Sequence, residues 1–305
     1  MKADAVFEGG GVKGIGLVGA LCCFEDNGYQ WQNIAGTSAG AIIAAMLAVG
    51  YTGQEMKKII YNLNYENLLD KNWKHYIPVL GKGLDFLIEK GLYRGKEFEK
   101  WITEILQAKG KIKFKDVSKD GQCRLKIIAT DITKGDMIIF PDDLKKYGLD
   151  PMEFEIAKAV RMSIGIPFFF IPYKLKYKNQ TSYIVDGGVL SNFPVWIFDV
   201  EGAPRWPTFG FRFMDEYESK TGSGKTNIIA YTMDLMETLL DKNETRYIKS
   251  KDKVRTIQVP SVGVKTTEFD ISKDKCNLLF KSGYAAAQKF FLQWDFEDYV
   301  QAYRL

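Results

Sequence analysis

Residues 34–50 read IAGTSAGAIIAAMLAVG. A short apolar run reaches Gly36, a small-residue turn follows, and a second apolar run extends from Ala41 to Val49. This order predicts a buried strand, a tight turn and a buried helix. We expect the helix to end at Gly50, because glycine readily adopts the left-handed conformation that closes helices.

Ser38 lies at the centre of this turn, in a Gly-x-Ser-x-Gly pattern between Gly36 and Gly40. Glycines on either side allow the chain to bend sharply without side-chain clashes. The turn also places the serine hydroxyl at a helix N-terminus, where free N–H groups and the helix dipole favour developing negative charge. The pattern, together with its position between a strand and a helix, makes Ser38 a candidate nucleophile.

Further strand and helix patterns surround this segment. A strand at Ala5–Phe7, a glycine-rich turn and a helix from about residue 15 to 27 precede it, which repeats the strand–turn–helix order. Residues 52–110 are expected to be helical with breaks, and 163–172 to form a loop. Other strands are predicted at 125–130, 137–140, 183–185, 208–213 and 256–259, and other helices at 151–162, 227–249 and after Ser272. The pattern predicts an α/β layered fold with a parallel sheet, in a single domain spanning residues 1–305.

The composition excludes several classes of protein. The chain has 305 residues, of which 46% are hydrophobic and 26% charged, as in ordinary globular proteins. Its net charge of +4 is too small to indicate a nucleic-acid partner. The four cysteines lack metal-binding spacing, so reduced and mostly buried thiols are expected.

The sequence shows neither a signal peptide nor a run of the about 18 apolar residues that a membrane span requires. We therefore expect a cytoplasmic protein with at most peripheral membrane contact. Secretion by a route that needs no signal peptide is compatible with this expectation.

The base that would activate Ser38 is not expected to be a histidine. His75 is the sole histidine, and it lies too early for the serine–acid–histidine order of α/β-hydrolases. Asp186 is the better candidate, because it follows a predicted strand and precedes Gly187 and Gly188. An aspartate at the carboxyl end of a strand in an open α/β sheet faces the ligand crevice. Asp131 occupies a comparable position, but the simpler interpretation is a turn aspartate that caps its own backbone.

The run Gly9-Gly10-Gly11-Val12-Lys13-Gly14 can turn several main-chain N–H groups toward one point, as an oxyanion requires. It also matches the dinucleotide pattern Gly-x-Gly-x-x-Gly. That reading needs an acidic residue at the end of the second strand, where this chain has the serine turn.

A second nucleotide-like stretch, Thr221–Thr226, resembles the end of a phosphate-binding loop, but Ser219 stands where the pattern needs glycine. Acidic residues also precede it. Nucleotide binding is therefore not expected. The sequence carries no EF-hand pattern either, and no metal or cofactor is predicted.

Taken together, three ordered motifs resemble the patatin-like phospholipases. They are Gly9–Gly14, Gly36–Gly40 and Asp186–Gly188, supported by residues 159–172 and 192–194. The resemblance implies a three-layer α/β/α fold with a mostly parallel central sheet. It also implies hydrolysis of a glycerolipid ester and peripheral contact with membranes.

The resemblance further implies a role for individual residues. Ser38 would attack the ester carbonyl and Asp186 would take its proton, without a cofactor. Gly10, Gly11 and Val12 would supply oxyanion N–H groups, and Lys13 would hold the loop or attract a lipid phosphate.

Several alternatives remain open at this point. Phospholipase A, lysophospholipase and neutral-lipid lipase or esterase activities are all compatible with the motifs, and so is a catalytically inactive lipid-binding module. Residues 168–171 are expected to pack in the core rather than line an acyl groove. Residues 73–93 are either a membrane-facing lid or a helical cap on the sheet.

Overall fold

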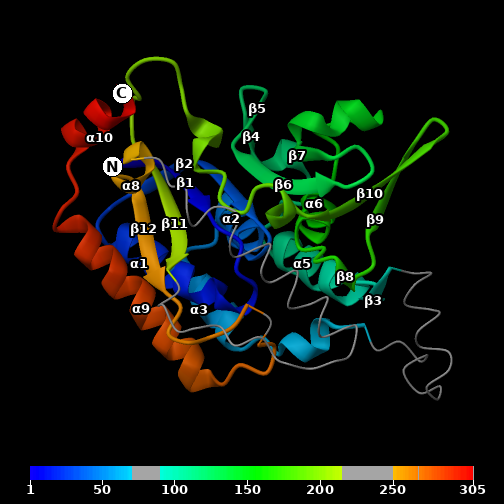
Figure 1. Cartoon of the computed structure of the whole chain (residues 1–305), viewed down its shortest axis with the longest axis horizontal. Coiled ribbons are helices and arrows are strands. Elements are labelled where there is room, and N and C mark those ends of the chain that lie inside the picture. Colours follow the sequence, from blue (N-terminus) through cyan, green and yellow to red (C-terminus); the bar gives the residue numbers. More distant parts are fainter. Residues whose placement is uncertain (71–89, 215–249, 267, 305) are drawn as a thin grey trace.

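The computed structural model describes residues 1–70, 90–214, 250–266 and 268–304 (Figure 1). The strands of the main sheet are β1 (Lys2–Phe7), β2 (Gln30–Thr37), β6 (Leu125–Asp131), β7 (Asp136–Phe140), β9 (Tyr173–Tyr177), β10 (Gln180–Asp186), β11 (Thr208–Met214) and β12 (Thr256–Pro260). Two small two-stranded sheets are formed by β3 (Gly91–Tyr93) with β8 (Phe168–Phe170), and by β4 (Ser118–Lys119) with β5 (Gln122–Cys123).

The α-helices are α1 (Gly14–Asp26), α2 (Ala39–Val49), α3 (Gly53–Tyr61), α5 (Lys96–Ala108), α6 (Ile156–Ser163), α8 (Ser250–Lys253), α9 (Lys273–Phe291) and α10 (Phe296–Arg304). The short 3₁₀ segments are η1 (Gly11–Lys13), η2 (Tyr65–Leu68), η4 (Phe114–Val117), η5 (Asp142–Tyr147), η6 (Gly187–Val189) and η7 (Val195–Phe198).

The main sheet has the strand order β12-β11-β1-β2-β6-β10-β9, and β7 also pairs with β6. The run from β12 to β6 is parallel throughout, as the strand–turn–helix repeats predicted. Strands β7 and β10 run antiparallel to β6, and β9 forms an antiparallel hairpin with β10. Helices flank this mostly parallel sheet, which confirms the predicted α/β fold.

Strand β6 determines where the site lies, because two strands of opposite direction share one of its edges. On that edge β2 pairs with the first half of β6 and ends with Thr37 opposite Ile128. Strand β10 pairs with the second half and ends with Asp186 opposite Ala129. Strand β7 covers the other edge along residues 127–131. The carboxyl ends of β2 and β10 therefore meet head to head.

Helix α1 is buried from Gly14 to Phe24 because it lies between the sheet and α9 (Figure 1). The ring of Phe24 packs on Phe209 and Phe211 of β11, with centroid distances of 4.7 and 5.2 Å. A Cβ on Gly19 would collide with the Phe280 carbonyl of α9, so glycine lets the two backbones touch. At the other end of the sheet, α6 packs beside β6 and β10.

The opposite face of the sheet is covered by the chain that follows Asp186. Segment η6 contacts β6, and η7 contacts β1 and β11. At Gly210 of β11 a Cβ would collide with the ring of Phe193, so this layer lies directly on the strand. The chain segment that begins at the candidate base Asp186 therefore also covers one face of the sheet.

The small β3–β8 sheet was not predicted. Residues 91–93 belong to the stretch that was expected to be helical with breaks, one of them at Gly91, and residues 168–170 were expected to be a loop. Gly91 instead pairs with Phe168, and Tyr93 with Phe170. Strands of three residues are too short to carry a periodic signal, and each exists here because the other lies beside it. Phe169 and Phe170 are buried as expected, whereas Phe168 is 38% exposed.

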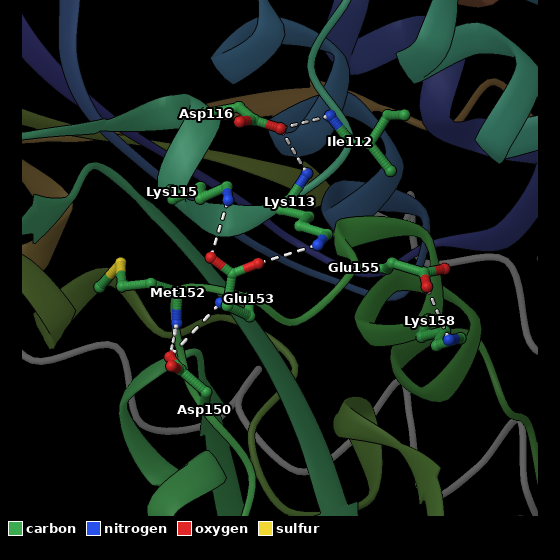
Figure 2. A network of polar contacts seen from close by, with 9 residues as sticks. All are labelled: Ile112, Lys113, Lys115, Asp116, Asp150, Met152, Glu153, Glu155 and Lys158. Carbon is green, nitrogen blue, oxygen red and sulfur yellow. Dashed lines mark hydrogen bonds and ion pairs between the residues drawn. The ribbon is translucent and has the colours of Figure 1, made fainter.

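A network of polar contacts joins residues 112–116 to the segment that leads into α6 (Figure 2). The Glu153 carboxylate accepts from Lys113 at 2.8 Å and from Lys115 at 2.7 Å. Asp116 caps the N–H of Ile112 and Lys113, both within 3.0 Å. These side chains are exposed, so water screens the ion pairs and they add little to stability. The backbone bond from Ile156 N–H to the Ile112 carbonyl, 2.9 Å long, carries the connection into α6 itself.

Cys22, Cys23, Cys123 and Cys276 are all unpaired and buried, which confirms the expectation for the thiols. Among the described helices, none combines the length and the apolar character needed to cross a bilayer. The described residues do not include His75, most of residues 73–93, the stretch Thr221–Thr226 or the predicted helix at 227–249.

Candidate active site

Ser38 lies on a sharply bent turn between β2 and α2. Its backbone has φ 53° and ψ −123°, a conformation that side-chain-bearing residues rarely adopt. The flanking glycines are required by close contact, because a Cβ on Gly36 would collide with the Gly40 backbone. A Cβ on Gly40 would collide in turn with the Phe7 carbonyl. The strained turn presents the hydroxyl at the N-terminus of α2, as the pattern predicted.

Asp186 is the hydrogen-bond partner of this hydroxyl. Ser38 Oγ donates to Asp186 Oδ2 at 2.7 Å, and the Gly188 N–H donates to Asp186 Oδ1 at 2.8 Å. Glycine is required at 187, since a Cβ there would collide with the Ile128 carbonyl. The distance from Ser38 Oγ to Asp186 Oδ2 is within the range that a serine nucleophile and its general base require.

The Asp186 side chain is fully buried. Desolvation raises the pKa of its carboxyl from 3.8 to about 7, although the bonds from Gly188 and Ser38 act in the opposite direction. A carboxylate with a pKa near neutrality accepts a proton far more readily than an exposed aspartate does.

Ser163, at the end of α6, supports the turn and was not singled out by the sequence. The Ser38 N–H donates to Ser163 Oγ at 2.9 Å, and Ser163 Oγ donates to the Ile128 carbonyl at 2.5 Å. Two residues later, the Gly165 carbonyl accepts the Asp186 N–H at 2.9 Å. The segment 163–165 therefore holds both members of the pair. The only sequence signal was its place within the 159–172 stretch.

Replacing Ser163 with alanine is expected to destabilise the protein and slow any reaction at Ser38. The buried Ser38 N–H would lose its acceptor, which costs about 1–3 kcal/mol. Urea unfolding and steady-state rates check this. Ser282→Ala is a suitable control, because it removes a serine bond of the same kind, to the Pro260 carbonyl, on α9. Equal effects of the two variants on the rate would contradict a role for Ser163 at the turn.

Of the three N–H groups expected to bind an oxyanion, two have no acceptor within the described part of the chain. The Val12 N–H, expected to point into the site, donates instead to the Thr266 carbonyl at 3.2 Å. The N–H groups of Gly10 and Gly11 have no acceptor among the described residues. The expectation for Val12 is therefore corrected by a contact with a segment more than 250 residues away along the chain. One small pocket is lined by Gly9, Gly10, Gly11, Ser38, Ile166, Asp186, Asn192 and Thr266.

Lys13 and Gly14, the last two residues of the run, pack against neighbouring elements. Lys13 is buried, and its Nζ lies 4.9 Å from the centre of the Phe213 ring, which favours the loop-holding interpretation. Gly14 begins α1, and a Cβ there would lie 3.7 Å from the side chains of Ala39 and Ile43. The helix that follows the glycine-rich run thus packs against the helix that follows Ser38.

Asp131 is not part of the pair. Its Oδ1 accepts the N–H of Thr133 at 2.9 Å and of Lys134 at 3.2 Å, and its Oδ2 accepts from Tyr147 Oη at 2.8 Å. This is the geometry of a turn aspartate that caps its own backbone. Among the described residues there is also no group of three His, Cys, Asp or Glu side chains arranged to hold a metal ion.

Comparison with known proteins identifies the family of this chain. The patatin-like phospholipase family matches residues 5–199, which include the glycine-rich run, Ser38 and Asp186. The uncharacterized protein YqhO of Bacillus subtilis is 40% identical over 296 residues, covering 97% of this chain and all (100%) of that protein. The probable lipid hydrolase 463L of invertebrate iridescent virus 6 is 32% identical over 194 residues, which is 62% of this chain and 61% of the viral protein.

Solved structures show the same fold at low identity. VipD from Legionella pneumophila has a TM-score of 0.56 and 18% identity, over 96% of this chain and 67% of VipD. The type III effector ExoU has a TM-score of 0.52 and 16% identity, over 96% of this chain and 53% of ExoU. This chain therefore spans about half the length of ExoU. Since the family match extends over most of the chain and includes the serine turn and its aspartate, the chain belongs to the patatin-like phospholipase family.

Proposed function

We propose that the protein hydrolyses carboxylic esters of glycerolipids, as a phospholipase A or lysophospholipase, through a Ser38–Asp186 dyad. The observation that carries this proposal is the 2.7 Å hydrogen bond from Ser38 Oγ to the buried Asp186 carboxylate. Family membership and the viral relative named a probable lipid hydrolase support lipid hydrolysis in general.

In the first step, Ser38 Oγ attacks the ester carbonyl carbon while Asp186 Oδ2 takes the hydroxyl proton. The carbonyl oxygen becomes an oxyanion, which the N–H groups of Gly10 and Gly11 would bind. The tetrahedral intermediate then collapses, the ester C–O bond breaks, and the departing alkoxide takes the proton from Asp186. The product alcohol leaves, and an acyl-enzyme ester remains on Ser38.

In the second step, Asp186 takes a proton from a water molecule, whose oxygen attacks the acyl carbonyl. The same two N–H groups stabilise the second oxyanion. The Ser38 C–O bond to the acyl group breaks, and Ser38 Oγ recovers its proton from Asp186. Free fatty acid is released, and neither step needs a metal ion or a cofactor.

Activity is expected to increase as the pH rises, with the midpoint of the increase near neutrality. Asp186 must be ionised to accept the proton, and burial raises its pKa to about 7. Values of kcat/KM should therefore fall about tenfold for each pH unit below this pKa and level off above it. A rate profile from pH 5 to 9 with a soluble ester checks this. A profile already level at pH 5, as for a base with a pKa near 4, would show that the reaction does not depend on a buried carboxylate.

An inactive lipid-binding module is the alternative of a different class. The strained backbone at Ser38 and the buried carboxylate at Asp186 both cost stability, and a module that only binds lipid has no use for either. We therefore favour the enzyme, with peripheral contact to the membrane that holds its substrate.

The proposal can be tested with a serine-directed fluorophosphonate and a lipid panel. The purified protein is expected to bind one probe per chain, at Ser38, and to release fatty acid from phospholipid or lysophospholipid. Release only from a triacylglycerol emulsion would identify a neutral-lipid lipase instead. A chain that binds lipid vesicles but neither labels nor releases fatty acid would be the binding module.

A further inference from the structure

Asn192 holds the first residue of the glycine-rich run from both sides. The Gly9 N–H donates to the Asn192 carbonyl at 3.1 Å, and Asn192 Nδ2 donates to the Gly9 carbonyl at 3.3 Å. The side chain is buried, with 8% exposed, and lines the same pocket as Ser38. One residue therefore pairs both main-chain groups of Gly9.

The run is also held at its other end, where the Val12 N–H donates to the Thr266 carbonyl. Between these two attachments lie Gly10 and Gly11, whose N–H groups have no acceptor among the described residues. Glycine backbones are the most mobile in a chain, so two fixed ends are needed to hold their N–H groups in one orientation. A hydrogen-bond donor contributes to catalysis only when it already points at the place where charge develops.

The side-chain amide of Asn192 lies close to Gly9, in the pocket that Ser38 also lines. A Cβ on Gly9 would collide with Asn192 Oδ1 and would lie 3.1 Å from Ser38 Cβ. Asn192 also belongs to the same chain segment as Asp186, since only η6 and a short turn separate them. This segment thus brings a proton acceptor to Ser38 and a clamp to the glycine-rich run.

We propose that Asn192 is a positioning residue that orients the Gly10 and Gly11 N–H groups toward the oxyanion. This inference rests on the proposed function, because it assigns a part in the same reaction. The side-chain amide of Asn192 is the group that would orient these N–H groups. The Asn192 main-chain carbonyl would remain in any variant, whereas the bond from Nδ2 to the Gly9 carbonyl would be lost.

The test compares Asn192→Ala and Asn192→Asp with the wild type. Asn33→Ala is the matched control, because Asn33 Nδ2 donates to Asp4 Oδ1 at 2.9 Å in the first half of β2, away from the serine turn. Fluorophosphonate titration counts competent sites, and kcat and KM for a soluble ester are then expressed per site. Thermal unfolding reports any loss of stability in each variant.

For Asn192→Ala we expect kcat per titrated site to fall about 10²-fold, the lower end for loss of one oxyanion donor, with KM nearly unchanged. In Asn192→Asp, kcat per titrated site should fall at least as far, because a carboxylate beside the Gly9 carbonyl would repel it instead of donating a hydrogen bond. Its charge should also move the acid limb of the pH profile upward by raising the pKa of Asp186. Asn33→Ala should keep the wild-type kcat per site.

Wild-type kcat per site in both Asn192 variants would overturn the inference and leave the proposed function intact. So would a loss confined to the number of titrated sites and the unfolding temperature, which would show a structural role only. A wild type that neither labels nor turns over would overturn the proposed function, and the inference with it.

Discussion

Replacing Ser38 with alanine is expected to abolish both fatty acid release and fluorophosphonate labelling. In the proposed mechanism the hydroxyl oxygen forms the bond to the substrate carbon, and an alanine side chain has no atom that can do so. In a well-studied serine protease, loss of the nucleophile lowers kcat by about a millionfold. Release of fatty acid from phospholipid or lysophospholipid, followed by mass spectrometry, measures the loss.

A Ser38→Gly variant separates this chemical effect from an effect on the fold. Ser38 has φ 53°, where glycine is relaxed and alanine stays strained. Both variants should be silent, but the glycine variant should be more stable than the alanine variant by about 1 kcal/mol. Labelling that persists in Ser38→Ala would place the nucleophile elsewhere and overturn the assignment.

Replacing Asp186 with asparagine is expected to remove activity while leaving the fold intact. The asparagine oxygen can still accept the Gly188 N–H, and its amide can donate to Ser38 Oγ, so both existing contacts keep a partner. An amide cannot take the serine proton, however. We expect kcat to fall by at least about 10⁴-fold, as for loss of other essential general bases.

The same variant should be more stable than the wild type at alkaline pH. Burial raises the pKa of Asp186 from 3.8 to about 7, so the folded state binds this proton more tightly than the unfolded state does. The contribution of the protonated carboxyl to stability is therefore full below about pH 4 and is lost as the pH rises to 7. Asparagine carries no charge at any of these values.

Above pH 7 we expect Asp186→Asn to raise the free energy of unfolding by a few kcal/mol, on the order of 1.4 kcal/mol for each pH unit of the pKa difference. The gain should shrink toward zero near pH 4. Urea unfolding of both proteins at pH 5 and pH 8 measures it. If the two proteins differ in free energy of unfolding by the same amount at both pH values, the pKa of Asp186 is not raised by burial.

Much of the site was predictable because its signals are local. The turn at Ser38 needs small neighbours at Gly36 and Gly40, and a buried helix needs the apolar run that follows them. Each requirement is met within about ten residues, so a steric rule applied to adjacent positions is sufficient to recognise it. The closing of α2 at Gly50, whose φ is 105°, was predictable for the same reason.

The structure places Asp186 in hydrogen-bond contact with Ser38, although the sequence argument that pointed to Asp186 was incomplete. The prediction relied on the rule for parallel strands, whereas β10 runs antiparallel to β6. Its carboxyl end reaches Ser38 because β2 and β10 approach each other along one edge of β6. Strand direction depends on how the chain returns to the sheet, which the residues around Asp186 do not encode.

The contacts that hold the serine turn and the glycine-rich run could not be predicted from the sequence. Ser163 meets Ser38 across a sequence separation of 125 residues, and Thr266 takes the Val12 N–H from a segment beyond the family match. The local residues therefore specified the candidate nucleophile, its turn and the candidate base. Which N–H groups stay available, and what holds the serine turn, depended on packing between distant segments. The physical reason is that backbone sterics act between neighbours in the chain, whereas hydrogen-bond partners are set by neighbours in space.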